Sequence, residues 1–445
     1  MQSPLGSAPT GFSRRQLIKG GGVAALGLMT TAALAACAPT PSSGSTSGSG
    51  TKTLNLMLAS WVDASFIRDV MQKSAADPLG VKLNLMTVDD GTYPAQAAAA
   101  QKSGQVPDLI FWTAQGIPSL QAAGVKLADL TSYAKTENQS DFYAQNYKAS
   151  TIDGKLHGLG FRCNTRGLVY RKDIAEAAGL TAPESWTFDE FGKFATGLNS
   201  SSVNGFAFEA KVGDGRASSN FLPLLWSTGA PLVTGGAGSF TIGFSDEQAQ
   251  KVLQFYYDAV NTWKSTPKDV ANWGYQETDS KFAKGTLASY SAGPFVFANV
   301  EQYPDTKKNL AVAPLPNAGT PASFWEEHTL MIHQDAPNRD LAEQFLKNMR
   351  SVKTQTVIAG REGDAQLSVR PQVNATAITN DVLKGFAKIL DTAVVPEPIN
   401  IAPLMNNAIL PAIESVCLGS ASVQAAAGTL RTNFQKALDQ INHGS

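Results

Sequence analysis

Cysteine, charge of one sign and long apolar runs are all scarce in this sequence of 445 residues. Its three cysteines are too few for a disulfide-rich scaffold. Lysine and arginine number 36 against 37 aspartate and glutamate, so the chain lacks the basic excess of a nucleic-acid-binding protein, and we expect no nucleic-acid partner. The 43% of hydrophobic residues can bury sizeable cores, and the length exceeds that of one average domain.

The signatures of several enzyme and metal sites are also missing. The sequence has no Gly-x-Ser-x-Gly elbow, no Walker A loop and no Gly-x-Gly-x-x-Gly after a strand pattern. The Gly-rich segment 234–239 lacks the lysine and the helix of a phosphate-binding loop, so it is predicted to be a plain loop. The four histidines, His157, His328, His333 and His443, do not have the spacing of a zinc site. We therefore expect no catalytic residue, no metal and no cofactor.

The first 37 residues have the layout of a secretory signal. Arg14, Arg15 and Lys19 flank an apolar stretch that is shorter than the roughly 20 apolar residues needed to span a bilayer. Residues 13–19 resemble a twin-arginine export signal, and residues 34–37 resemble a bacterial lipobox.

These resemblances imply a signal peptide over residues 1–36 and acylation of Cys37, as in a palmitate-bearing lipoprotein. Residues 37–51 are rich in Pro, Ser, Thr and Gly, and are predicted to form a flexible tether. The expected location is the extracytoplasmic face of the cell membrane, with the lipid as anchor. The alternative is an uncleaved transmembrane anchor with an unmodified Cys37.

The hydrophobic pattern after the tether predicts alternating strands and helices. Strands are expected over residues 53–58, 81–85 and 108–112, with helices over 65–76 and 91–103 between them. Strand, helix and strand at this spacing indicate a parallel sheet.

Further along the chain, apolar periodicity predicts one more strand and several helices. The strand is expected at 168–170, with helices at 172–178 and 246–263. Residues 183–191 are predicted to form a turn and a capped helix start. Two more helices are predicted to be capped by Asn338 and Ser422.

The order and spacing of several segments are informative: 107–112, 124–130, 153–159, 168–173, 178–186, 282–285, 291–295, 313–316, 337–346 and 417–423. Together they resemble the extracellular solute-binding proteins of ABC importers (family 1), the sugar-binding group that includes maltodextrin-binding protein. The resemblance covers nearly all of the chain after the tether. It implies an α/β fold of two lobes, each a β-sheet flanked by helices, joined by a hinge. The expected lobes are residues 52–162 with 316–368, and residues 163–315 with 369–445.

The same resemblance implies capture of a sugar or oligosaccharide between the lobes and its delivery to the ABC permease. A sugar has an apolar face and a rim of hydroxyls, so its site needs flat aromatic rings and paired polar groups. Of the seven tryptophans, Trp186 and Trp263 are assigned to packing. The others are expected at strand ends or in polar loops, where they can reach a ligand: Trp61, Trp112, Trp226, Trp273 and Trp325. Trp112 also matches a cleft tryptophan of the family.

Polar candidates come from the two predicted interlobe crossings and from the rim. Arg162 and Asn164 lie in the first crossing, where the family contacts ligand; an interlobe salt bridge is the other reading of Arg162. Glu326 and Glu327 follow Trp325, and neighbours on a strand face opposite sides, so at most one should face the cleft. The remaining candidates are Asp63, Asp90, Gln115, Gly293, Phe295 and Arg361, with Phe295 standing where the family has tryptophan.

Two other functions stay open at this point. Arg162 and Arg361 fit the same fold with a glycerophosphodiester or another charged solute. A secreted glycoside hydrolase is the second alternative, although the opposed directions of Glu326 and Glu327 argue against a catalytic pair. Cys163 and Cys417 can be bridged or can be two buried thiols. The expected protein is a monomer whose partners are a carbohydrate, the permease and the membrane.

Overall fold

The computed structural model describes residues 52–62, 65–359, 361–363 and 365–444. The predicted signal peptide, the lipidation of Cys37, the tether and the rim candidate Asp63 lie outside these residues. None of the helices within the described ranges combines the length and hydrophobicity needed to cross a bilayer.

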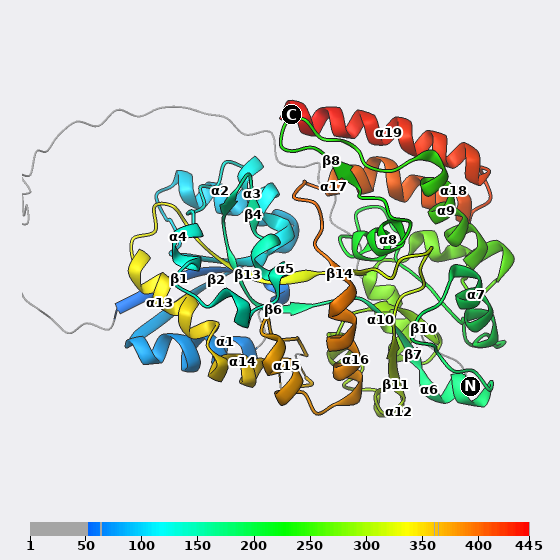
Figure 1. The fold of residues 1–445 in the computed structure, drawn as a ribbon, viewed down its shortest axis with the longest axis horizontal. Coiled ribbons are helices and arrows are strands. Elements are labelled where there is room, and N and C mark those ends of the chain that lie inside the picture. Colours follow the sequence, from blue (N-terminus) through cyan, green and yellow to red (C-terminus); the bar gives the residue numbers. More distant parts are fainter. Residues whose placement is uncertain (1–51, 63–64, 360, 364, 445) are drawn as a thin grey trace, which may run out of the picture. The chain divides into compact units, whose positions relative to one another are not determined.

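A five-stranded sheet forms the first half of the fold (Figure 1), in the order β2-β1-β3-β13-β6. Its strands are β1 (Lys52–Ala59), β2 (Val81–Val88), β3 (Leu109–Thr113), β6 (Leu159–Asn164) and β13 (Glu326–Ile332). β1 pairs in parallel with β2 and with β3, which confirms the predicted parallel unit. β13 comes from much later in the sequence, lies between β3 and β6, and pairs antiparallel with both. The local hydrophobic pattern could not predict this position.

A three-stranded sheet forms the second half, in the order β10-β7-β11. Its strands are β7 (Gly167–Arg171), β10 (Ser289–Ala292) and β11 (Leu310–Ala313), and both pairings are antiparallel. Only Thr165 and Arg166 separate β6 from β7, so the chain passes from one sheet to the other in two residues. Short two-stranded ladders complete the strands: β4 (Thr151–Ile152) with β5 (Lys155–Leu156), β8 (Val233–Thr234) with β9 (Thr241–Ile242), and β12 (Ser323–Phe324) with β14 (Ala393–Val394).

Helices flank both sheets, as predicted. Those before β6 and the two directly after β13 are α1 (Ser65–Val70), α2 (Tyr93–Lys102), α3 (Ile117–Ala122), α4 (Thr131–Ala134), α5 (Ala144–Lys148), α13 (Arg339–Met349) and α14 (Val352–Ala359). The others are α6 (Lys172–Ala177), α7 (Phe188–Gly197), α8 (Ala217–Trp226), α9 (Asp246–Tyr257), α10 (Tyr275–Ala283), α11 (Val296–Asn299), α12 (Pro304–Lys308), α15 (Pro371–Ala377), α16 (Asp381–Ile389), α17 (Ala402–Leu404), α18 (Leu410–Cys417) and α19 (Val423–His443).

Helix capping agrees with the sequence at two positions and differs at a third. Thr187 and Glu190 form a capping box at the start of α7, and the Ser422 hydroxyl accepts a hydrogen bond from the backbone at the start of α19. Asn338 precedes α13, but its side chain makes no capping bond. Its amide instead donates to both carboxylate oxygens of buried Asp108, so the predicted cap was wrong.

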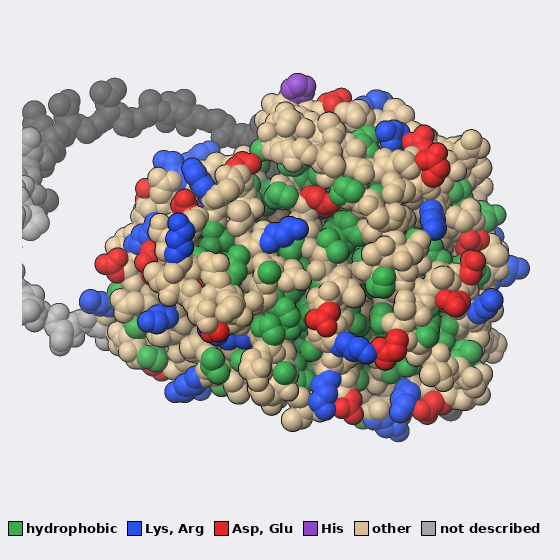
Figure 2. Space-filling view, viewed as in Figure 1, with side chains coloured by type: hydrophobic (Ala, Val, Ile, Leu, Met, Phe, Trp, Pro, Cys, Tyr) green, Lys and Arg blue, Asp and Glu red, His purple; other side chains and the backbone are tan. Residues whose placement is uncertain are grey.

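Two separate hydrophobic cores lie under the two sheets. One contains Leu56, Phe111 and Ile332, together with the apolar face of α13. The other contains Val169 and Tyr290, together with the buried apolar residues of α8, α9 and α19. On the face shown in Figure 2, side chains of both charge signs are interspersed, as expected from the balanced composition.

Three further expectations are settled by the fold. Cys163 and Cys417 are buried free thiols, which excludes a bridge between them. Residues 235–240 are the turn between β8 and β9, which confirms the predicted loop. Trp226 is the last residue of helix α8 and not a loop or strand-end residue, so its predicted setting was wrong.

Candidate functional site

Two tryptophans share one carboxylate at the carboxyl ends of the parallel strands. Trp61 follows β1, Asp90 follows β2, and Trp112 lies near the end of β3. The indole nitrogens of Trp61 and Trp112 both donate to Oδ1 of Asp90, at 2.8 Å and 2.6 Å. Parallel strands place their carboxyl ends at one edge, which is where open α/β sheets bind ligands. The sheet thus brings three of the predicted site residues together.

The two tryptophans differ in how much aromatic surface they present. Trp61 is 43% exposed, whereas Trp112 is only 9% exposed. Trp112 stacks on Tyr93 with 4.9 Å between ring centroids, and Gly116 packs against the indole so closely that a Cβ there would lie 2.3 Å from it. Trp112 therefore forms a fixed wall, and Trp61 offers the open aromatic face.

Gln115 supplies an unused hydrogen-bond acceptor beside this wall. Its amide nitrogen donates to the carbonyl of Trp325 at 2.9 Å. Its Oε1 atom is buried and has no hydrogen-bond partner among the described residues. A buried acceptor without a donor is costly, so a hydroxyl supplied by a ligand would stabilise this arrangement. We call Trp61, Asp90, Trp112, Gln115 and His328 the strand-end cluster.

His328 on β13 connects this cluster to the crossing between the sheets. Its ring lies 4.8 Å from that of Trp61, and its Nδ1 accepts from Nε of buried Arg162 at 2.7 Å. Its Nε2 lies 3.3 Å from Oε1 of Glu326, which also forms an ion pair with Arg166. Burial alone would raise the pKa of Glu326, but Arg166 and His328 hold that pKa well below its ordinary value.

Glu327 points to the opposite side of β13, as the strand alternation predicted. Its carboxylate accepts from Asn146 at 2.8 Å, Thr329 at 3.0 Å and the Trp325 indole at 3.2 Å. Burial raises the pKa of Glu327 to about 7. Glu327 and Trp325 are both fully buried, so in this conformation neither side chain presents surface to a ligand.

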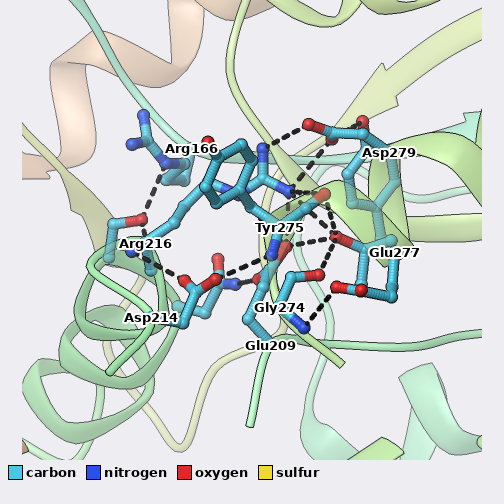
Figure 3. A network of polar contacts seen from close by, with 12 residues as sticks. Arg166, Glu209, Asp214, Arg216, Gly274, Tyr275, Glu277 and Asp279 are labelled. Carbon is cyan, nitrogen blue, oxygen red and sulfur yellow. Dashed lines mark hydrogen bonds and ion pairs between the residues drawn. The ribbon is translucent and has the colours of Figure 1, made fainter. Parts of the chain in front are cut away.

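A second cluster of buried charges lies beside the three-stranded sheet (Figure 3). Arg216 donates to Glu209 at 2.6 Å and to Asp279 at 2.9 Å. Tyr275, which is 45% exposed, lies 5.3 Å from the Arg216 guanidinium, and its backbone nitrogen donates to Asp214 at 2.7 Å. Burial raises the pKa of Asp279, and the charge of Arg216 opposes that rise. We call Glu209, Asp214, Arg216, Tyr275, Asp279 and Phe295 the arginine cluster.

Phe295 lies between two guanidinium groups. Its ring centroid is 5.2 Å from Arg166 and 5.4 Å from Arg216. Gly293 makes this possible, because a Cβ on it would lie 2.7 Å from the Phe295 ring. Contacts therefore run without a break from Trp61 through His328, Glu326 and Arg166 to Phe295, Arg216 and Tyr275.

The other predicted residues lie outside these clusters or support them. Asn164 is buried between Arg166 and Gln366. Trp273 is 4% exposed, and its carbonyl accepts from Ala210 and Lys211, next to Glu209. Trp226 stacks on Phe324 with 6.0 Å between centroids, and Arg361 lies 4.0 Å from the ring of Phe66 at the surface. Neither Trp226 nor Arg361 belongs to a cluster, but Phe324 lies 5.6 Å from the guanidinium of Arg166, which connects the two clusters.

Several residues of the site carry no local sequence signal. Glu209 and Arg216 precede α8, whereas Tyr275 and Asp279 lie on α10. Isolated charges without periodicity resemble solvated surface residues. The polar residues Glu326 and His328 were the available hint, because charged residues in a strand otherwise buried need partners. Among the described residues, no group of three or more His, Cys, Asp or Glu side chains could hold a metal ion.

Comparison with known proteins identifies relatives over most of the chain. Residues 68–356 match the family model described as bacterial extracellular solute-binding protein. The chain is 26% identical over 257 residues to the maltodextrin-binding protein MdxE of Bacillus subtilis, covering 55% of this chain and 57% of that one. It is 25% identical over 256 residues to the mannitol-binding protein of Pseudomonas aeruginosa, covering 54% of this chain and 55% of that one.

Solved structures share the fold at low identity. An ABC transporter solute-binding protein of Thermotoga lettingae, bound to α-D-tagatose, matches with a TM-score of 0.74 and 21% identity, covering 87% of this chain and all of that one. The GacH receptor of Streptomyces glaucescens, solved without ligand and with acarbose, matches with a TM-score of 0.72 and 22% identity, covering 87% and 98%. The fold is therefore the two-lobed α/β fold of these binding proteins.

Proposed function

The chain belongs to the bacterial extracellular solute-binding proteins, and from that membership we propose that it captures a sugar or oligosaccharide for an ABC importer. The lobes would be residues 52–162 with 316–368, and 163–315 with 369–445. The ligand would lie where the strand-end cluster and the arginine cluster meet. Relatives described as binding maltodextrin and mannitol, and structural neighbours solved with tagatose and acarbose, support a polyhydroxylated ligand.

The observation that carries the proposal is the pair of indoles held by Asp90. A carboxylate that fixes two indole rings leaves the face of Trp61 open to the C–H face of a sugar ring. The free acceptor of Gln115 and the exposed carboxylate of Asp90 suit the hydroxyls of the rim. Tyr275 offers a second exposed ring from the other cluster.

The charge state of the site favours a neutral ligand over a phosphodiester. Arg166 is paired with Glu326, and Arg216 with Glu209 and Asp279. Arg162 donates to His328, and Arg361 lies against Phe66 at the surface. A phosphate would have to compete with these carboxylates for the guanidinium groups of Arg166 and Arg216. We therefore propose a neutral sugar as the ligand and keep a charged solute as the alternative.

Capture needs movement of the lobes but no bond-breaking chemistry. Hinge closure would trap the sugar between the clusters, and the closed form would present the surface that the permease recognises. Glu326 and Glu327 point to opposite sides of β13 and do not form an acid/base pair across one site, which supports a binding protein that leaves its ligand unchanged.

The cellular setting is also part of the proposal. The N-terminal pattern supports twin-arginine export, removal of residues 1–36 and lipidation of Cys37. The tether of residues 37–51 would then hold a monomeric binding domain at the extracytoplasmic face of the membrane, beside its permease.

Calorimetric titration of the purified protein tests this function. Maltose, maltotriose, mannitol and tagatose would be compared with glycerophosphocholine. We expect at least one of the neutral ligands to bind. The Trp61→Ala substitution should weaken the affinity for that ligand at least about tenfold. Trp61→Phe should weaken the affinity less, because phenylalanine keeps a flat ring. Val352→Ala, at an exposed position on α14, is the control. Binding of glycerophosphocholine alone would favour the charged solute, and hydrolysis of maltotriose would contradict the proposal.

A further inference from the structure

A small internal cavity of about 20 Å³ lies between the three-stranded sheet and helices α8 and α9. Leu168 of β7 and Ser291 of β10 line it from the sheet. Asn220 of α8 and Tyr256 of α9 line it from the helices. All of the lining residues are buried, so the cavity lies inside the protein and not on its surface.

The wall of this cavity is mostly apolar, but it contains two unpaired polar atoms. Oδ1 of Asn220 and Oγ of Ser291 are buried and have no hydrogen-bond partner among the described residues. The two residues are only 5% and 6% exposed. A buried polar atom without a partner carries a desolvation cost, and native folds pair nearly all such atoms. Both atoms therefore call for a partner that the cavity can hold.

The orientation of the Asn220 amide is set from its other side. Its nitrogen donates a hydrogen bond to Oε2 of Glu209. A carboxylate only accepts, so the amide nitrogen faces Glu209 and the amide oxygen is left for the cavity. Oε1 of the same carboxylate accepts from Arg216 and from Thr278, each at 2.6 Å. Asn220 thus connects the cavity to the arginine cluster.

The size and polarity of the cavity select its occupant. A water molecule needs a cavity of roughly 10–15 Å³ or more, with at least two polar partners. This cavity has that volume and offers Asn220 and Ser291 as partners. A water donates one proton to Oδ1 of Asn220, and its oxygen accepts from the hydroxyl of Ser291. Organic molecules, which need pockets of hundreds of Å³, do not fit.

We propose that this cavity is a binding site for a single water molecule, which bridges Asn220 on α8 and Ser291 on β10. The bridge joins the helix to the sheet in the middle of an apolar core. It also holds the amide oxygen in the cavity, which keeps the amide nitrogen on Glu209. The water is thus a fixed part of the support behind the arginine cluster.

A crystal structure of the sugar-free protein, at a resolution that shows ordered water, tests the site directly. We expect one water within hydrogen-bond distance of both Oδ1 of Asn220 and Oγ of Ser291. Ser291→Val should lose this water, because its methyl groups fill the cavity. A cavity without ordered water in the parent protein would overturn the proposal, as would a Ser291 hydroxyl that donates to a backbone carbonyl instead.

Thermal melts test whether the two residues act through a shared partner. Ser291→Ala should lower the melting temperature by about 2–4 °C, because it removes one end of the bridge. The same substitution in an Asn220→Ala background should lower it by less than about 1 °C, because the bridge is already broken. Ser201→Ala, at an exposed position, is the control and should change neither protein.

Equal effects of Ser291→Ala in the two backgrounds would overturn the shared bridge. If the Asn220→Ala protein does not fold, the crystal structures of the parent and of Ser291→Val decide alone. All of these measurements use the protein without sugar, so a failure of the proposed function would not affect them.

Discussion

Buried Glu327 should make the stability of the protein depend on pH between about 4.5 and 7. The carboxyl group has an ordinary pKa of 4.5, and burial raises it to about 7. The folded state therefore holds a proton more tightly than the unfolded state. The stability that this proton contributes is fully present below pH 4.5 and is lost as the pH rises through 7. The shift corresponds to roughly 3 kcal/mol of unfolding free energy.

Glu327→Gln removes the titrating group and keeps an oxygen that can accept from Asn146 and Trp325. Urea denaturation of both proteins across pH 4 to 8 measures the difference. We expect the variant to gain stability relative to the parent by about 3 kcal/mol between pH 4.5 and pH 7. A difference that stays constant over this range would refute the reasoning.

Glu326→Gln is the matched control, one residue away on the same strand. The pKa of Glu326 is lowered in the folded state by Arg166 and His328, against the effect of burial. The stability that Glu326 contributes is therefore present above its unfolded pKa and is lost as the pH falls below about 4.5. The two variants should thus differ from the parent in opposite directions and in different pH ranges.

Three further outcomes follow from the packing. Gly116→Ala should destabilise the fold by about 1–3 kcal/mol in urea, because its Cβ would lie 2.3 Å from the ring of Trp112; no change in stability would contradict that close approach. Arg216→Met should lower the free energy of unfolding by about 3–5 kcal/mol at pH 7, because it leaves two buried carboxylates without their partner. A loss below about 1 kcal/mol would argue against the paired arrangement. Cys163 and Cys417 should react with Ellman's reagent only after denaturation; rapid reaction of the native protein would show that a thiol is accessible.

The sequence allowed the local elements to be predicted where a short-range pattern sets the structure. Alternating Leu residues in β1 and the capping boxes or caps of α7 and α19 are examples, because each depends on neighbours a few residues apart. The pairing of β13 with β3 could not be predicted from the local pattern, since it joins residues more than 200 positions apart; only the family resemblance placed both segments in one lobe. Asn338 shows the same limit: a distant carboxylate, Asp108, takes the side chain that the helix start would have used.

The site was predictable to a similar extent. The rule that ligands meet the carboxyl ends of strands brought Trp61 and Trp112 into view, and Asp90 was also a candidate. That both indoles donate to the carboxylate of Asp90 could not be predicted. Trp325 shows why residue type alone is a weak guide, because its place at the end of a short strand put it in the core. Apart from Phe295, the arginine cluster was missed, because its members come from segments that only the tertiary fold brings together.

A crystal structure of the protein with the neutral sugar that binds it best tests the central claim most directly. The account predicts an intact sugar with one ring face against Trp61 and a hydroxyl within hydrogen-bond distance of Oε1 of Gln115. A sugar bound away from both clusters, or a ligand cleaved in the crystal, would contradict it.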